Sequence, residues 1–456
     1  MTTVADWNPS RCQQPDVRIA VVLPIDGATT IRLGLPDAAY DVSGQSNIKR
    51  RLRNVDLKAY LSGGGVSMRI GAEELGSAHT WQIVPPQGGN AGSPPAIRVD
   101  DIMAGRGFHW QQRTTQHLPG TLTLIRHDDA LVLTCRLPIE EYLVGVMTSE
   151  MSGRCPVEFL KAQCVVARSW TLAAAERKHA DLDADLCNDD CCQRFQGLTR
   201  QDDSARRAAR ETSGQVLLTE DHRVVDANYS KSCGGIVETP ENVFGTPKTG
   251  LSALVDAPAK SQAQSLLPLD ASLTNYLTGR SPGLVDVYCS STRVPETDLP
   301  GYLGRVDTGR GFFRWTVSYP REALEDVVRR NETIPDSPGR LLDIEVTRRG
   351  VSGRATELDL VFAGTDDRRT THALHGEYAI RNALSDSFLY SSAFEVRVDR
   401  DQAGQALRFH LDGAGWGHGA GMCQIGALGM ALAGHRFDAI LHHYFPSARL
   451  AGVYDG

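Results

Sequence analysis

The chain has 456 residues and a formal net charge of −7 at pH 7. This length allows two or three domains with a large core, and the acidic balance argues against bulk electrostatic binding to nucleic acid or an anionic membrane. Ten cysteines do not make a disulfide scaffold in a chain of this size. Three of them fall within six residues, which indicates local metal or redox chemistry.

The N-terminal part of the chain predicts a polar lead followed by a β-rich domain. Residues 1–15 are predicted to be a polar, poorly ordered lead. Residues 1–27 lack a basic region followed by a sustained apolar core and a small-residue cleavage site, so no signal peptide is expected. Residues 16–105 are predicted to form a small β-rich domain, because short runs such as RIAVVLP and TWQIVPP alternate with Gly, Pro and Asn clusters. The run 85–95 is expected to be an exposed loop. No stretch is long enough to span a bilayer as a helix.

A mixed α+β domain is predicted over residues 106–456, and its central element is the stretch LPIEEYLVGVMTSEM, residues 137–151. The stretch predicts an amphipathic helix that begins near Pro138. Glu150 is in phase with the apolar stripe, whereas Glu141 points roughly the opposite way. An inward carboxylate at a helix end is solvated there, paired with a cation, or held in a cleft with a raised pKa, as a general acid requires.

A second helix is expected to open at Pro156 and to run to about Lys178. It carries Lys161 and Arg168, which are seven residues apart and therefore lie on nearly one face. Either cation can hold an oxygen atom of a ligand, neutralise Glu150, or be an ordinary solvated surface charge.

The segment HADLDADLCNDDCCQRFQG, residues 179–197, is the sharpest metal candidate. His179, Cys187, Cys191 and Cys192 offer an imidazole and soft thiolates, which are the ligands that zinc prefers. The spacing is not that of a standard finger, and adjacent Cys191 and Cys192 cannot easily both bind one ion. Buried or free thiols in a loop are the alternative.

The segment YSKSCGG, residues 229–235, predicts a strand that ends in a turn and presents Tyr229, Lys231, Ser232 and Cys233. Cys233 is a candidate nucleophile, but no Cys-His signature accompanies it, and Gly-Gly favours a tight turn.

Later segments predict a hairpin with the turn GVSG, a helix at HGEYAIRNAL and a strand at AFEVRVD. The C-terminal segment has five glycines between Gly413 and Gly421, which predict a tight loop around His418 before a short helix. The loop lacks the Lys-Ser/Thr ending of a phosphate loop. His418 is either structural or close to a ligand.

Taken in order, these blocks resemble the stage II sporulation protein D (SpoIID) family, which includes LytB-type amidase enhancers. The resemblance rests on the helix pair, CNDDCCQRFQG, YSKSCGG, SGRATELDL, GEYAIRNAL with AFEV, and GWGHGAGMCQIGALGMALAG with ILHHYFP. It covers about residue 110 to the C-terminus and implies a SpoIID-like catalytic domain with a glycan-binding cleft.

The resemblance implies a peptidoglycan lytic transglycosylase with Glu150 as its catalytic residue. It implies a cleft lined by Lys161, Arg168, Tyr229 and Lys231, and we predict that Ser232, His418 and Gln424 also bind substrate. The family's structural zinc maps to His179, Cys187 and Cys192, with Cys191 as a competing ligand because it takes a place that His often occupies. The family also implies a location in the cell envelope, the periplasm or outside the cell, although no export signal is visible.

One inward carboxylate suits a lyase better than a hydrolase, because hydrolases usually use two. A transglycosylase can use the C6 hydroxyl of N-acetylmuramic acid, so Glu150, kept protonated by its apolar face, would act first as acid and then as base. The alternative function is a non-catalytic glycan-binding enhancer of a cell-wall amidase. A weaker alternative is a thiol redox or metal-sensing protein.

Overall fold

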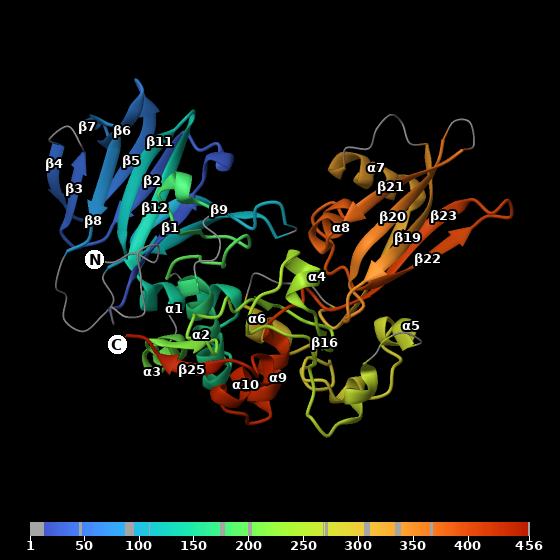
Figure 1. Cartoon of the computed structure of the whole chain (residues 1–456). Coiled ribbons are helices and arrows are strands. Elements are labelled where there is room, and N and C mark those ends of the chain that lie inside the picture. Colours follow the sequence, from blue (N-terminus) through green and yellow to red (C-terminus); the bar gives the residue numbers. More distant parts are fainter. Residues whose placement is uncertain are drawn as a thin grey trace. The chain divides into compact units, whose positions relative to one another are not determined.

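The computed structural model describes residues 13–44, 48–86, 95–108, 110–173, 178–198, 203–267, 269, 272–304, 311–332, 339–364 and 368–454. The chain forms two compact units (Figure 1). Unit 1 comprises Met1–Leu160, Thr171–Val216 and Ala451–Gly456, and unit 2 comprises Lys161–Trp170 and Leu217–Leu450. Among the described residues, no helix is both long enough and apolar enough to cross a membrane.

Two β-sheets make up most of unit 1 (Figure 1). One has seven strands in the order β13-β1-β12-β11-β8-β3-β4, and the other has six in the order β10-β9-β2-β5-β6-β7. The strands are β1 (Asp16–Val22), β2 (Thr30–Leu35), β3 (Tyr40–Gly44), β4 (Ile48–Leu52), β5 (Val55–Ser62), β6 (Gly65–Ile70), β7 (Glu73–Ala78), β8 (Thr80–Val84), β9 (Ile97–Ala104), β10 (Gln112–Leu118), β11 (Thr121–His127), β12 (Ala130–Pro138) and β13 (Leu186–Cys187).

The two sheets bury their apolar faces against each other. Side chains alternate along the strands, so that Leu122 and Leu124 of β11 are fully buried while their neighbours are partly exposed. The indole N–H of Trp81 in β8 donates to the Val66 carbonyl of β6, 2.8 Å away, and so links the sheets. The strands β10, β11 and β12 also join these sheets, so the β-rich part continues beyond the predicted range 16–105. Most of the predicted loop 85–95 lies outside the described residues.

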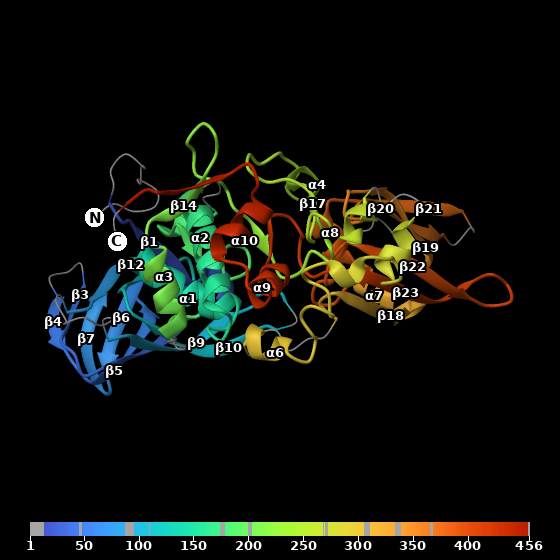
Figure 2. The same ribbon diagram turned by 90° about the horizontal axis from the view of Figure 1, so that it is seen from below.

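Helix α1 (Ile139–Glu150) follows β12 directly and begins next to Pro138, where the sequence predicted the helix to begin. The extended backbone of Pro138 ends the strand, and two carboxylates lie in the first turn of the helix, where its dipole favours them. Helix α3 (Asp203–Glu211) lies beside α1 and buries its alanines (Figure 2). Helix α2 (Val157–Ala173) begins after Pro156. Its predicted extension to Lys178 crosses residues 174–177, which lie outside the described residues.

Unit 2 contains two three-stranded sheets, β18-β23-β22 and β19-β20-β21, which share one apolar core with helices α7 and α8. The predicted hairpin is β19 and β20, and its turn is closed by the Gly350 amide, which donates to the Arg354 carbonyl 2.8 Å away. The bounds are β18 (Arg314–Pro320), α7 (Arg321–Asn331), β19 (Arg340–Arg349), β20 (Ala355–Ala363), β21 (Arg369–His375), α8 (Glu377–Ala383), β22 (Phe394–Arg400) and β23 (Ala406–Ala414).

The rest of unit 2 is built from short elements. Strand β15 (Tyr229–Ser230) pairs with β24 (Met422–Cys423), and β16 (Ile236–Val237) pairs with β17 (Leu254–Val255). Its described helices are α4 (Pro240–Phe244), α5 (Leu273–Leu277), α6 (Leu299–Leu303), α9 (Gln424–Leu432) and α10 (Phe437–Tyr444). Two further strands in the described part of the chain are β14 (Gln215–Leu218) and β25 (Arg449–Gly452). The chain is thus of the predicted α+β class, with a β-rich region followed by mixed regions.

Candidate active site

Glu150 is the last residue of α1, and its side chain is only 8% exposed. Its Oε1 accepts a hydrogen bond from the backbone N–H of Arg194, 3.0 Å away. A helix C-terminus disfavours negative charge, so a backbone donor at this point offsets part of that penalty. Glu141 on the same helix is partly exposed and pairs with Arg206 at 3.4 Å. The helix phase therefore distinguished the two acids correctly.

Residues 187–197, which we call the cysteine loop, pack against α1. The ring of Phe195 lies 5.4 Å from that of Tyr142, measured between centroids. The backbone N–H of Gln196 donates to the Ser149 hydroxyl, 2.9 Å away. The amide that binds Glu150 belongs to this same loop, so the loop's position sets the position of the acid's hydrogen bond.

Gly145 makes this close packing possible. A Cβ at Gly145 would lie 2.4 Å from Cε2 of Phe195. We therefore expect Gly145→Ala to lower the free energy of unfolding by about 1–3 kcal/mol through overpacking. Gly301 is a matched control, because it is also helical but has no atom within 4 Å of an added Cβ. Urea denaturation of both variants tests the point, and equal stabilities would show that the loop does not pack on α1 as described.

A second carboxylate, Asp190, lies in the electrostatic field of Glu150, and sequence reasoning missed it. The pKa of Asp190 is raised to about 6, because burial and, to a smaller extent, the charge of Glu150 outweigh the lowering effect of the Arg194 cation. Nε of Arg194 bonds Oδ1 of Asp190 at 2.5 Å, and the guanidinium lies 4.2 Å from the ring centroid of Trp110. Asp190 is thus engaged in an ion pair. The i,i+4 spacing of Asp190 and Arg194 was the available signal.

The cysteine loop also carries most of the predicted metal ligands. The ligand atoms of His179, Cys187, Cys191 and Cys192 all lie within 4.8 Å of one another. Sγ of Cys187 is 2.9 Å from Sγ of Cys191, which is 3.6 Å from Nε2 of His179. Despite being adjacent in sequence, Cys191 and Cys192 place both of their sulfurs in this group. One imidazole and three sulfurs form a donor set that fits zinc.

The close sulfurs of this cluster shift one another's pKa values in opposite directions. Hydrogen bonding between Cys187 and Cys191 raises the pKa of Cys187 and lowers that of Cys191. The loop is further anchored on the sandwich, because Oδ1 of Asp189 accepts from the Gly105 amide at 3.0 Å. A zinc ion at the cluster would fasten the loop that supplies the Arg194 N–H to Glu150, which is a structural role.

The predicted cations of α2 lie in its unit 2 segment. Lys161 is partly buried, with its Nζ 5.6 Å from the ring centroid of Phe437. Arg168 is fully buried and donates to Sγ of Cys164 at 3.3 Å. Neither matches a fully solvated surface cation.

The remaining predicted binding residues gather in unit 2. The Ser232 amide donates to the Trp416 carbonyl at 3.0 Å, and the Ile425 amide donates to the Lys231 carbonyl at 3.0 Å. Gln424, at the first turn of α9, is buried and donates to the side-chain oxygen of Gln163 at 3.3 Å. The structure therefore brings the segment 229–235 against the glycine-rich loop.

Both ring nitrogens of His418 are bonded within this loop. Nε2 is 2.9 Å from the Tyr229 carbonyl oxygen, which can only accept, and Nδ1 accepts from the Ala420 amide at 3.1 Å. This pattern requires a neutral ring with its proton on Nε2. Burial, together with the positive charges of Arg381 and Arg354, lowers the pKa of His418 to about 3. The ring is therefore neutral near pH 7.

A pH dependence of stability follows from His418. Its folded-state pKa lies below the ordinary value near 6.5, so its stabilising contribution is present above pH 6.5 and is lost as pH falls toward 3. Glutamine can keep both hydrogen bonds but does not titrate. Below pH 6.5 we therefore expect the unfolding free energy of His418→Gln to fall less steeply than that of wild type, by up to about 1.4 kcal/mol per pH unit. Urea denaturation at pH 7, 6 and 5 measures the difference, and parallel curves for the two proteins would contradict the assignment.

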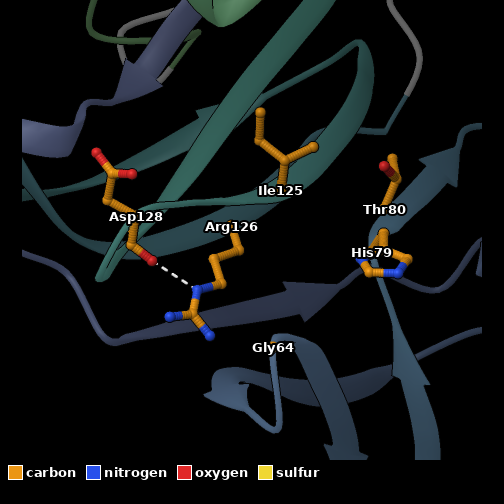
Figure 3. Close-up of a pocket in the computed structure, with 6 residues that line it drawn as sticks. All are labelled: Gly64, His79, Thr80, Ile125, Arg126 and Asp128. Carbon is orange, nitrogen blue, oxygen red and sulfur yellow. Dashed lines mark hydrogen bonds between the residues drawn. The ribbon is translucent and has the colours of Figure 1, made fainter.

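A separate hollow lies on the β-sandwich of unit 1 and is drawn in Figure 3. Its labelled residues include His79, Arg126 and Asp128, and Nε of Arg126 donates to the Asp128 carbonyl at 2.5 Å. None of the residues predicted from the sequence as catalytic, substrate-binding or metal-binding lines it.

Two segments of the chain match known protein families. Residues 127–218, which include Glu150 and the cysteine loop, match the family described as Stage II sporulation protein, SpoIID. This match, together with the similarity to an amidase enhancer, supports the resemblance to the SpoIID/LytB family that the motifs predicted. Residues 299–421 also match a family described as a domain of unknown function, DUF8618.

Two relatives are similar over most of the chain. An uncharacterized protein of Brachyspira hyodysenteriae is 25% identical over 327 residues, which is 72% of this chain and 70% of that protein. The amidase enhancer of Bacillus subtilis is 25% identical over 333 residues, which is 68% of this chain and 40% of that protein. The match thus covers less than half of the amidase enhancer.

Proposed function

We propose that this protein acts on the cell wall as a peptidoglycan lytic transglycosylase, with Glu150 as general acid and base. The observation that carries the proposal is the buried carboxylate of Glu150, which a backbone N–H of the cysteine loop holds within the SpoIID-matching segment. A buried, hydrogen-bonded acid at a helix end is suited to a role in proton transfer.

The proposed reaction cleaves the bond between C1 of N-acetylmuramic acid and O4 of N-acetylglucosamine. Glu150 donates its proton to O4 as the C1–O4 bond breaks. The resulting carboxylate then takes the proton of the C6 hydroxyl on the same muramic acid, and O6 bonds to C1. The products are a 1,6-anhydro end and a free 4-hydroxyl, Glu150 is protonated again, and no water is consumed.

The state of Asp190 supports a single-carboxylate mechanism. A hydrolase of the usual kind needs a second free carboxylate as base or nucleophile. Asp190 is instead tied to the Arg194 guanidinium at 2.5 Å, so it is poorly suited to activate water. Using the substrate's own hydroxyl removes the need for a second catalytic carboxylate.

In this proposal the other predicted residues bind the glycan or support those that do. Lys161 and Tyr229 are partly exposed and suit direct contact with sugar oxygens. Arg168, Lys231, Ser232 and Gln424 are buried, so they suit a supporting role behind the binding surface. Zinc held by His179, Cys187 and Cys192, with Cys191 as the competing ligand, would stabilise the loop beside Glu150. The partner is peptidoglycan, which implies a location in the cell envelope.

A second candidate function is a non-catalytic glycan-binding enhancer of a cell-wall amidase, and the name of the Bacillus subtilis relative favours it. The two proposals differ in what they require of Glu150. An enhancer would still bind glycan and stimulate a partner amidase after Glu150→Gln, because neither activity needs proton transfer.

The experiment that tests the proposed function is mass spectrometry of the products released from intact and from peptide-stripped glycan. A lytic transglycosylase releases chains with 1,6-anhydro ends, a hydrolase releases reducing ends, and an enhancer releases neither. The two substrates also show whether stem peptides must be removed first.

A further inference from the structure

Unit 2 contains a second cluster of metal-ligating side chains, separate from the cysteine loop. Cys233, Asp256, Cys289 and Cys423 place one ligand atom each within 4.8 Å of one another. All four residues are at most 2% exposed. We call this group the buried cysteine site. The sequence offered no pattern for it, because the four residues are spread over 191 positions, and Cys233 was interpreted as part of a turn.

Short strand pairs bring the four segments together. Strand β16, which follows Cys233, pairs with β17, which precedes Asp256, and the Asp256 amide donates to the Gly235 carbonyl at 2.9 Å. The Asp256 carbonyl in turn accepts from the Tyr288 amide at 2.7 Å, next to Cys289. Strand β24 ends at Cys423, whose Sγ accepts from the Cys233 amide at 3.2 Å.

The distances between the ligand atoms match those expected around a tetrahedrally coordinated zinc ion. Zinc–sulfur bonds of about 2.3 Å put two tetrahedral sulfur ligands about 3.8 Å apart, and a sulfur and a carboxylate oxygen about 3.5 Å apart. Sγ of Cys233 is 3.7 Å from Sγ of Cys289 and 3.5 Å from Oδ2 of Asp256. A sulfur–sulfur separation of 3.7 Å is also far beyond the length of a disulfide bond.

The carboxylate of Asp256 is held for ligation. Its Oδ1 accepts from the Tyr444 hydroxyl at 2.6 Å and lies 3.3 Å from Nε2 of His443. This leaves Oδ2 facing Cys233. Within the described parts of the chain, no lysine or arginine forms an ion pair with Asp256, although the residue is fully buried. A buried carboxylate needs a compensating cation, and orienting partners of this kind are typical around metal ligands.

Backbone N–H groups at this site stabilise the deprotonated, thiolate form of its cysteines. Cys423 is the N-cap residue of α9, and its Sγ accepts from the Gly426 amide at 3.3 Å. Sγ of Cys233 accepts from the Gly235 amide at 3.3 Å. A helix N-terminus and backbone N–H groups both favour the charged sulfur over the neutral thiol. Gly426 also gives room, since an added Cβ would lie 2.3 Å from Oδ2 of Asp256.

We propose that Cys233, Asp256, Cys289 and Cys423 bind one zinc ion in a closed, tetrahedral structural site. Soft sulfur ligands select zinc over magnesium or calcium, which take oxygen ligands. Four protein ligands leave no open position for substrate, so the ion cross-links four segments of unit 2 and takes no part in the glycan chemistry. This site is additional to the cluster of the cysteine loop and does not depend on the proposed function.

The test first removes the other cluster. The variant Cys187→Ser/Cys192→Ser, expressed with zinc and purified, is expected to retain one equivalent of zinc per chain by plasma mass spectrometry. After exchange it is expected to bind one Co²⁺ with the absorption of a tetrahedral thiolate complex. Adding Asp256→Asn on this background is expected to abolish both signals. A folded double variant with less than a tenth of an equivalent of zinc and no cobalt–thiolate absorption would overturn the proposal.

A second measurement keeps the proposal testable if the double variant does not fold. Native mass spectrometry then compares wild type with Asp256→Asn alone, which preserves the shape of the side chain and removes its charge. The Asn variant is expected to carry one zinc ion fewer than wild type. Cys135→Ser serves as the control, because Cys135 is buried in β12, outside both clusters, and its zinc count should equal that of wild type. An unchanged count in Asp256→Asn would refute the site.

Discussion

Glu150→Gln is expected to reduce the release of anhydro-ended muropeptides by about 10²–10⁴-fold or more, while the folded structure persists. The amide oxygen of glutamine can still accept the hydrogen bond from the Arg194 N–H, 3.0 Å from Oε1 in the native chain. The variant therefore loses the transferable proton and little else. Anhydro ends are counted by mass spectrometry of the products, and circular dichroism and thermal unfolding report the fold.

The matched control is Glu141→Gln on the same helix. Glu141 is partly exposed and pairs with Arg206 at the surface, and such a pair contributes about 0–1 kcal/mol. This variant should cleave glycan at the wild-type rate. If Glu150→Gln retains turnover, the catalytic assignment is wrong. If wild type itself releases no anhydro ends but stimulates an amidase, and Glu150→Gln does so equally, the enhancer function replaces the proposal.

The sequence predicted elements whose signal is local. The helix phase at 137–151 identified Glu150 as inward, and short β-type runs between Gly, Pro and Asn clusters predicted the β-rich domain. The hairpin at GVSG was equally clear. Each of these predictions depends on residues that are close together in the sequence, within a few helical turns or two neighbouring strands. The local pattern of residues is enough to predict such elements.

What the sequence did not predict depends on contacts between distant segments. Cys233 has two glycines after it, so its local signal is a turn, and only the folded chain shows that it faces Asp256 and Cys289. Asp190 was hidden for a similar reason, since its raised pKa arises from burial. Adjacent Cys191 and Cys192 illustrate a third limit, because the loop conformation that brings both sulfurs into one group of ligand atoms has no signature in the spacing.

Cys187→Ser is expected to lower the stability of unit 1 by about 3–5 kcal/mol, since loss of a metal site belongs to the few changes that exceed the ordinary range. Cys187 is buried in β13, which pairs with β1, so the cluster ties the cysteine loop to the sandwich. Loosening the loop also displaces the Arg194 N–H from Glu150, so glycan cleavage should fall together with zinc content and stability.

The control for Cys187→Ser is Cys135→Ser in β12, which removes a buried thiol of the same unit without touching the cluster. This variant should be less stable than wild type, but its zinc content and the position of its cysteine loop should not change. Removing zinc from wild type with a chelator should reproduce the effect of Cys187→Ser, and adding zinc back should reverse it. Both results are expected if loss of the ion, rather than the serine side chain, causes the effect. If Cys187→Ser keeps its stability and loses only a response to oxidants, the cluster is a redox site, and contacts with β1, Gly105 and α1 hold the Arg194 N–H without a metal ion.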